Sequence, residues 1–374
     1  MKTMQHPAIA SVLEQIHQDY HALLKTGTKF SIAAMLNFDD FNIQDRCRSY
    51  KSHADADQLI KIVKAFSEEY GIWLPNAKHH ITCALFLYPN ATFDRMLTMM
   101  QNLTIDFYLN DVMGRDVFKY LSLPQQAYAK NLIERMGRVN ERLLEAPDLS
   151  PLEAANINVL QKFKDTATAD WFKRFVHLYS YHIGVTHKDC NAAVLRHIPP
   201  IEEYISLRCH YGGMHHIISW VEYGTGAFLD WNWLRAMGLQ QEVERLHAAV
   251  AKFGALSNDL FSFEKEVIDH RTDANLLMVI ALHHPEQSLT DVIHAAANTV
   301  SEFLKEAVTM MTIIRERCQH LPATAMLQTL AQHLTDLELV IQACWMWQVH
   351  TQRYKHTDSI FLETILEDEK DIVH

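Results

Sequence analysis

Glycine and proline, the residues that most often interrupt helices, are scarce in this sequence. Only 11 glycines and 10 prolines occur among 374 residues. Few segments alternate apolar and polar residues with the period of two that is typical of half-buried strands. Both absences argue against a β-rich fold. We therefore predict an all-α protein.

Long apolar runs and a secretion signal are also missing. No stretch approaches the ~18 to 20 uninterrupted apolar residues that a membrane-spanning helix needs. The first residues, MKTMQHPAIASVLEQIHQDY, lack the basic start, the apolar run and the small-residue cleavage site of a signal peptide. We expect a soluble, cytoplasmic protein without a membrane span.

Clustered cysteines and a positive net charge are absent as well. The 6 cysteines stand singly, which argues against a disulfide framework or a soft-metal site. The 23 histidines show no HExxH motif. The formal net charge of −11 argues against a nucleic-acid partner, because phosphate backbones require concentrated Lys and Arg. The negative net charge does not exclude a small anionic substrate, because a few well-placed cations are enough to bind one locally.

What the sequence does contain is helical periodicity over long segments. Apolar residues recur at helical spacing in residues 11–25, 54–74, 125–145, 289–318 and 323–354. Long helices joined by short turns are typical of a helical bundle. No linker, repeat or low-complexity tract divides the chain, so we predict a single α-helical domain over residues 1–374.

The segment SNDLFSFEKE, residues 257–266, places three oxygen-bearing side chains at intervals of four. On an α-helix such a step advances about 400°, so Asn258, Ser262 and Glu266 would form a ladder on one face. Mg²⁺ prefers about six oxygen ligands and commonly takes some of them from a substrate phosphate. The segment is therefore either a metal site for a diphosphate or an ordinary solvated helix face.

A second candidate is FYLNDVMGRD, residues 107–116, at the end of an apolar helix predicted over residues 92–111. Asp111 and Asp116 lie five residues apart there. Carboxylates at the mouth of an apolar core are costly unless they are paired or bound to a metal. Asp106 either faces the same cavity or serves as a capping or pairing residue. The alternative for the acidic pair is a helix end that reaches the surface.

Two further segments carry cations beside unusual neighbours. In ISLRCHYGG, residues 205–213, Arg208 precedes the pair Gly212–Gly213. Two glycines inside a helical segment predict a kink or close packing against a neighbour. In WMWQVHTQRY, residues 345–354, Arg353 and Tyr354 follow two tryptophans. Arg makes forked, charge-assisted hydrogen bonds to phosphate oxygens, although an aromatic core stripe ending in an exposed Arg explains this segment equally well.

Taken together, these segments resemble the bacterial class I terpene synthase (terpene cyclase) family. NDLFSFEKE is similar to the family's second metal motif, Asn-Asp-x-x-Ser-x-x-x-Glu, at every defining position, and it includes the Lys before the Glu. The late Arg-Tyr pair matches Arg353 and Tyr354. Arg208 resembles the diphosphate-sensing Arg of bacterial members, and Gly212 matches the effector position. The resemblance spans about residues 107–354 and implies a class I terpenoid synthase bundle around a central apolar cavity.

The first metal motif departs from the family pattern, which is an Asp-Asp pair followed by a further acid. With Asp111 as the first Asp, Val112 replaces the second and Asp116 is the trailing acid. With Asn110 in first place, an amide replaces a principal ligand. We prefer the first alignment because it keeps both carboxylates. In this alignment Val112 stands where the family has its second Asp, so the contact that this Asp makes to the sensing Arg, here Arg208, is in doubt.

The resemblance implies an Mg²⁺-dependent cyclase that uses three ions and a prenyl diphosphate. Its implied metal ligands are Asp111, Asp116, Asn258, Ser262 and Glu266. Its implied diphosphate-binding residues are Arg208, Lys265, Arg353 and Tyr354. Its implied cavity wall comprises Phe107, Tyr108, Tyr204, Trp345 and Trp347. Gly212 would present its carbonyl to the developing charge. The reaction would end by proton loss or by capture of water.

Several alternatives differ in class. A chain-elongating prenyltransferase would carry a second Asp-rich motif where NDLFSFEKE stands, and a class II cyclase would need a DxDD motif that the sequence lacks. A non-catalytic helical scaffold, or degenerate cyclase, stays open because of the first motif. LNDVMGRD is similar to bacterial diterpene synthases of the dolabellane-forming kind, which favours geranylgeranyl over farnesyl diphosphate as substrate. A homodimer is an open expectation.

Overall fold

Helices form almost all of the regular structure in the computed structural model of this protein. It describes residues 7–143, 148–186, 191–195 and 197–366, without the side chains of residues 7, 8, 115, 116 and 193. Within these residues there is no β-strand, only isolated bridges such as that between Phe30 and Phe361. The prediction of an all-α protein is confirmed.

The helices of the first half are α1 (Pro7–Thr26), α2 (Ile32–Leu36), α3 (Ile43–Cys47), α4 (Ala56–Glu69), α5 (Ala77–Leu87), α6 (Phe93–Met113), α7 (Arg115–Phe118), α8 (Leu123–Met136), α9 (Pro151–Thr166) and α10 (Ala169–Thr186). Those of the second half are α11 (Ala192–Leu195), α12 (Ile201–Tyr211), α13 (Met214–Thr225), α14 (Trp231–Ala236), α15 (Gln240–Phe263), η1 (Glu264–Asp269), α16 (Leu276–His283), α17 (Leu289–Cys318), α18 (Ala325–His350), η2 (Gln352–Tyr354) and η3 (Leu362–Thr364).

The long helices begin at residues that supply the hydrogen bonds missing from a helix N-terminus. Ser288 and Asp291 form a capping box at the start of α17, and Ser150 and Glu153 form one at α9. The helix predicted over residues 289–318 has the same bounds as α17. The segment predicted as 323–354 is shorter as an α-helix, because α18 ends at His350.

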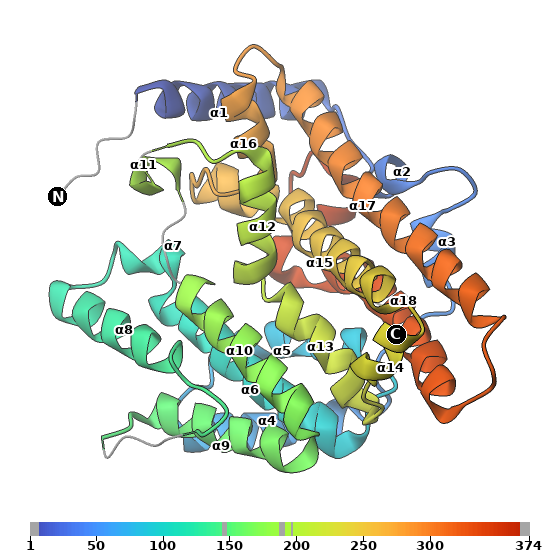
Figure 1. Cartoon of the computed structure of the whole chain (residues 1–374). Coiled ribbons are helices and arrows are strands. Elements are labelled where there is room, and N and C mark those ends of the chain that lie inside the picture. The colour runs from blue at the N-terminus through green and yellow to red at the C-terminus, as the bar shows by residue number, and fades with distance from the viewer. Residues whose placement is uncertain (1–6, 144–147, 187–190, 196, 367–374) are drawn as a thin grey trace.

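Two groups of helices enclose the centre of the molecule. Helix α6 packs against α4, α5 and α9, while α15 packs along α17, α18, α12 and α13. Figure 1 shows α8, α9 and α10 at one side and α15, α17 and α18 at the other, with α12 and α13 between them. The side chains of both groups meet in a continuous buried core. No helix in the described ranges has the length and apolarity to cross a bilayer.

The chain after α18 folds back over the bundle and is held by backbone pairing. The amide of Phe30 donates to the Ile360 carbonyl at 2.8 Å, and the amide of Leu362 donates to the Phe30 carbonyl at 2.9 Å. The Glu363 carboxylate accepts from the amides of Ile32 and Ala33 at the start of α2. This anchoring positions the η2 turn, which carries Arg353 and Tyr354.

Candidate active site

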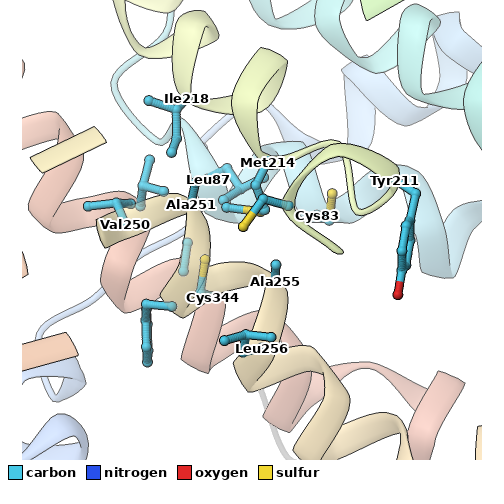
Figure 2. Close-up of a cluster of buried hydrophobic side chains, with 14 of the residues drawn as sticks. Cys83, Leu87, Tyr211, Met214, Ile218, Val250, Ala251, Ala255, Leu256 and Cys344 are labelled. Carbon is cyan, nitrogen blue, oxygen red and sulfur yellow. The ribbon is translucent and has the colours of Figure 1, made fainter. Parts of the chain in front are cut away.

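A cavity of about 200 Å³ lies between the two groups of helices. Its wall is built from α5, α6, α10, α12, α13, α15 and α18, so residues distant in sequence share one surface. Figure 2 shows part of the apolar lining, where Met214, Cys344 and Ala255 gather around α15. A Cβ at Gly254 would lie 2.3 Å from the Met214 methyl, so the flexible Met214 side chain occupies the space that a side chain at position 254 would take. The apolar lining includes Cys83, Leu87, Leu103, Phe107, Ile217 and Trp347.

One end of the cavity wall is charged and polar. Seven candidates from the sequence lie at the cavity surface or form part of it: Arg208, Gly212, Asn258, Lys265, Glu266, Arg353 and Tyr354. They come from α12, the turn that follows it, α15, η1 and η2. Three cationic side chains, Arg208, Lys265 and Arg353, thus line the same cavity.

Arg208 is buried, with 5% of its surface exposed, and is held by the Asn-Asp pair of α15. Its Nε donates to Asp259 Oδ1 at 2.6 Å and its Nη2 donates to Asn258 Oδ1 at 2.7 Å. Burial opposes the charge, but Asp259, together with the smaller effects of Tyr211, Tyr204 and Glu266, raises the Arg208 pKa well above its ordinary value. Arg208 is therefore a permanently charged group in a fixed position.

The Gly212–Gly213 pair breaks the helix as predicted. Helix α12 ends at Tyr211, α13 begins at Met214, and Gly213 has a φ of 73°. A Cβ on Gly212 would lie 2.7 Å from Arg208 Nη1 and 2.8 Å from the Arg208 carbonyl oxygen. The absent side chain at Gly212 lets the Arg208 guanidinium fold against the turn that lines the cavity.

The ladder expected in SNDLFSFEKE does not lie on one continuous α-helix. Asn258 and Ser262 are in α15, but Glu266 lies in the π-helical segment η1, which begins at Glu264. A π-helix closes its hydrogen bonds from i to i+5, so each residue turns less about the axis than in an α-helix. Glu266 is therefore displaced from the α-helical register. Its Oε2 accepts from Asn275 Nδ2 at 3.1 Å.

The chemistry of this segment fits a hard cation. Ser262 is fully buried and its Oγ has no hydrogen-bond partner among the described residues. A buried hydroxyl without a partner is costly, and a metal ion would satisfy it. No group of three or more His, Cys, Asp or Glu side chains in the described part of the chain has the arrangement of a metal site. Binding at this segment would therefore rely on the amide and hydroxyl oxygens of Asn258 and Ser262 beside the Glu266 carboxylate.

On the opposite side, the first acidic motif is paired with the C-terminal turn. Asp111 Oδ1 accepts from Asn110 Nδ2 at 2.9 Å and lies 3.4 Å from Arg353 Nη2. Burial raises the pKa of Asp111, but Arg353 outweighs burial and lowers it. Arg353 Nη1 also donates to His80 Nε2 at 2.7 Å. This requires a neutral imidazole, and burial together with Arg353 lowers the His80 pKa to about 4.

The cavity surface includes Asn110 but not Asp111. The residue that reaches the cavity is thus Asn110, which holds the first position of the motif in the alternative alignment. Asp111 is its neighbour in sequence. The side chain of Asp116 lies outside the described residues, although its backbone belongs to α7. The preferred alignment with Asp111 and Asp116 as ligands stays a prediction.

The structure places only two of the five predicted wall residues, Phe107 and Trp347, at the cavity. Tyr108 follows Phe107 and is turned by about 100° on α6, away from the cavity. Trp345 precedes Trp347 by two residues, or about 200° on α18, and packs edge-on against Phe261 at 5.5 Å.

Tyr204 is the third departure from the predicted wall. It is buried, and its hydroxyl donates to Asp259 Oδ2 at 2.5 Å. A buried phenol needs such a partner, and the Asp259 carboxylate supplies it. Tyr204 therefore supports the Asp259 carboxylate that holds Arg208, and it does not form part of the cavity surface.

Sequence reasoning missed several polar groups of the site. Gln348 lines the cavity and accepts from Asn258 Nδ2 at 3.0 Å, while Asn258 Nδ2 also donates to the Tyr354 hydroxyl at 2.8 Å. His182 and Thr186 line another part of the wall, together with Asp106, for which the sequence left open a cavity-facing or a pairing role. These are single polar residues inside apolar helices, without a spacing motif. Only the tertiary contacts distinguish them from ordinary buried polar residues.

Comparison with known proteins agrees with this geometry. The family described as "Terpene synthase family 2, C-terminal metal binding" matches residues 103–308, more than half of the chain. A comparison with curated proteins found no match.

Among solved structures, the chain is similar to germacradien-4-ol synthase from Streptomyces citricolor, with 17% identity, a TM-score of 0.67, and coverage of 86% of this chain and 100% of that one. An α-eudesmol synthase matches with 17% identity and a TM-score of 0.67, over 84% of this chain and 98% of that one. A hedycaryol synthase matches with 15% identity and a TM-score of 0.66, over 83% and 98%. At these identities the likeness shows the fold alone.

Fold and site thus define a class I terpene synthase, a lyase that acts on prenyl diphosphates with the help of a divalent metal. Within that class, the chain belongs to terpene synthase family 2. The predicted enzyme class is confirmed, and the non-catalytic scaffold is not supported.

Proposed function

We propose that this protein cyclises geranylgeranyl diphosphate, with three Mg²⁺ ions, to a water-quenched dolabellane alcohol. The observation that carries the proposal is one cavity with two parts of different chemistry. Arg208, Asn258 and Tyr354 are joined by hydrogen bonds where the wall is polar, and Met214, Cys344 and Ala255 gather where it is apolar. A prenyl diphosphate has the same division between an anionic head and a hydrocarbon tail.

The polar end would bind the diphosphate through groups that are already charged. Arg208 is held in place by Asp259, so little freedom is lost when it contacts a phosphate oxygen. Arg353 is paired with Asp111 at 3.4 Å, and a diphosphate would compete with that carboxylate. The buried Tyr354 hydroxyl lines the same cavity and accepts from Asn258 Nδ2 at 2.8 Å. Preorganised cations that stabilise a leaving anion lower the barrier to ionisation.

The metal ions would be held by Asp111 and Asp116 on one side and by Asn258, Ser262 and Glu266 on the other. When bound, Mg²⁺ supplies Lewis-acid neutralisation of the leaving diphosphate. The Ser262 hydroxyl without a partner supports this assignment. Asn258 links the metal side to the cation side, because its Oδ1 already accepts from Arg208.

The apolar end would fold the allylic cation and exclude bulk water. Phe107 and Trp347 lie beside the polar part of the wall, with the Arg353 guanidinium 5.9 Å from the Phe107 ring centroid and the Tyr354 ring 6.1 Å from the Trp347 ring. Aromatic faces carry the negative quadrupole that attracts a cation, and the Gly212 turn forms part of the same wall. Removal of water strengthens these interactions and protects the cation from early capture. The ring faces would therefore stabilise intermediates after the diphosphate has left.

Two observations support the product class. LNDVMGRD resembles the dolabellane-forming diterpene synthases, among them a hydroxydolabelladiene synthase. The similar solved structures include three enzymes named for alcohols: germacradien-4-ol, α-eudesmol and hedycaryol. An alcohol product requires that water, rather than loss of a proton, ends the reaction.

The test is incubation with geranyl, farnesyl or geranylgeranyl diphosphate and Mg²⁺, followed by diphosphate assay and mass spectrometry of the organic extract. We expect diphosphate release and a cyclic alcohol of twenty carbons from geranylgeranyl diphosphate. Turnover of farnesyl diphosphate alone would refute the substrate, and a purely hydrocarbon product would refute the ending by water. No diphosphate release from any of the three would refute the proposed function.

A further inference from the structure

A buried acid–histidine pair lies in the cavity wall, apart from the predicted metal and diphosphate groups. His182 Nε2 on α10 is 2.8 Å from Asp106 Oδ1 on α6, and both residues line the cavity together with Thr186. A buried ion pair gains little stability over an apolar replacement. Its position in the wall of a cavity built for a carbocation therefore calls for a chemical explanation.

The hydrogen-bond partners of His182 define its protonation. Nδ1 lies 2.8 Å from the His210 carbonyl oxygen, which only accepts, and Nε2 faces the Asp106 carboxyl group. The Thr186 hydroxyl donates to the His182 carbonyl oxygen at 2.7 Å, so it approaches Nδ1 as an acceptor. Both ring nitrogens thus carry hydrogen when Asp106 is ionised, which gives an imidazolium–carboxylate pair.

The electrostatic surroundings agree with this protonation. Burial alone would lower the His182 pKa, but the Asp106 carboxylate outweighs burial and raises it. The neighbouring His216 ring, 4.7 Å away, does not compete for the charge, because burial lowers its pKa well below the ordinary value. The carboxylate and the imidazolium cancel in net charge, so the pair does not trap the substrate cation as an isolated anion would.

The two side chains differ in how far they reach into the cavity. The Asp106 side chain keeps 18% of its surface exposed and the His182 side chain keeps 4%. Asp106 is therefore the more accessible of the two, and His182 connects it to the His210 carbonyl. Asp106 precedes Asp111 by five residues on α6, which places it about 7.5 Å along the helix axis from the first metal motif. Asp106 is therefore separate from the first metal motif.

A water molecule needs polar partners to be held in an apolar cavity. The Asp106 carboxylate offers an acceptor, and the Thr186 hydroxyl lies in the same wall. A carboxylate that holds a water is also placed to take its proton when the oxygen attacks a cation, provided that the carboxylate stays ionised. The raised pKa of His182 keeps a positive charge beside it, which favours the ionised state.

We propose that Asp106 is the catalytic base that takes the proton from the water that quenches the final carbocation, and that His182 positions Asp106. The inference rests on the proposed function. A lone pair of the water oxygen forms the C–O bond to the cationic carbon. One O–H bond then breaks, its electron pair stays on oxygen, and its proton goes to Asp106. The products are a neutral alcohol and a protonated carboxyl group, which returns its proton to solvent when the cavity opens.

The main test compares Asp106→Asn with the wild type for diphosphate release and for the ratio of alcohol to hydrocarbon. Ionisation depends on other residues, so release should persist. The alcohol share should fall at least about tenfold, because a general base contributes about 10² to 10⁴ in rate. Reaction in ¹⁸O-labelled water identifies the alcohol oxygen. Asp94→Asn is the matched control, since Asp94 is an exposed residue of the same helix.

A spectroscopic measurement separates a positioning role of His182 from simple packing. In histidine-labelled protein, ¹⁵N shifts should show both His182 nitrogens protonated at pH 7 and a neutral ring in Asp106→Asn. The His182→Gln variant assigns the signal and should also lower the alcohol share. A neutral His182 ring in the wild type would overturn the inference.

The product assays give further ways to refute it. An unchanged alcohol share in Asp106→Asn would overturn the inference, as would loss of diphosphate release with intact circular dichroism. Absence of diphosphate release in the wild type would instead refute the proposed function, and the ¹⁵N shifts would still decide whether the ion pair exists.

Discussion

Replacement of Asp259 by Asn should be among the most destabilising single changes in this protein. Asp259 is fully buried and accepts from Arg208 Nε at 2.6 Å, from the Tyr204 hydroxyl at 2.5 Å and from the Leu276 amide at 2.9 Å. An amide in its place turns an NH₂ group towards these donors and removes the countercharge of Arg208. Loss of one partner of a buried ion pair costs about 3–5 kcal/mol.

Two other variants at the Arg208, Asp259 and Tyr204 contacts provide stabilities with which that of Asp259→Asn can be compared. Tyr204→Phe removes one hydrogen bond to a charged group and should cost about 1.5–3 kcal/mol. The double replacement Arg208→Met with Asp259→Leu removes both charges, so it should be more stable than Asp259→Asn. It should nevertheless release no diphosphate, because the proposed function needs the cation at position 208.

The assay is urea unfolding followed by circular dichroism, beside thermal melting at a fixed scan rate. Each variant is also tested for diphosphate release with Mg²⁺. The reasoning is refuted if Asp259→Asn costs less than Tyr204→Phe. It is equally refuted if the double variant is the least stable of the three, since the penalty would then not come from an uncompensated charge.

Three further predictions concern the metal side and the pH dependence of stability. Ser262→Ala removes a buried hydroxyl without a partner, so stability without Mg²⁺ should rise by about 1 kcal/mol, while diphosphate release falls; a drop in stability would contradict this. Asp111→Asn should slow diphosphate release more than Asp106→Asn, and the reverse order would show that the first motif is registered wrongly. Burial raises the Glu222 pKa to about 7 from 4.5, against the opposing effect of Arg174. The wild type should therefore lose stability as pH rises from 4.5 through about 7. Glu222→Gln should not, and melting curves at pH 5 and pH 8 should show its advantage growing by about 2.5 kcal/mol; equal pH dependence would contradict this.

The helices were predictable because their signals are local. Each of these signals depends on a few turns of chain: few helix-breaking residues, apolar residues at helical spacing, and capping residues. The helix predicted over residues 289–318 therefore has the bounds of α17. The Gly212–Gly213 break was predictable for the same reason, since glycine itself carries the conformational freedom. The change from α15 to the π-helical η1 was not predictable. There the buried Glu264 accepts from the Ile360 amide at 2.8 Å, a contact between residues 96 apart in sequence.

Several assignments within the site also depended on tertiary contacts. Tyr204 and Trp345 are aromatic residues close to motif positions, yet one supports Asp259 and the other packs on Phe261. Conversely, Asp106 and His182 carry no motif and meet only because α6 and α10 pass the same cavity. Sequence alone does not show which side of a helix faces a neighbour when most sides are buried.

The sequence by itself determined the class of fold, the family motifs and the chemistry of the residues that would bind a metal and a diphosphate. These follow from residue types and short spacings, which the chain carries wherever it folds. Only the tertiary structure decided which of these side chains share the cavity, that Asp259 holds Arg208, and that an acid–histidine pair faces the apolar wall. Those facts depend on the packing of helices far apart in the chain, and packing is a property of the whole core.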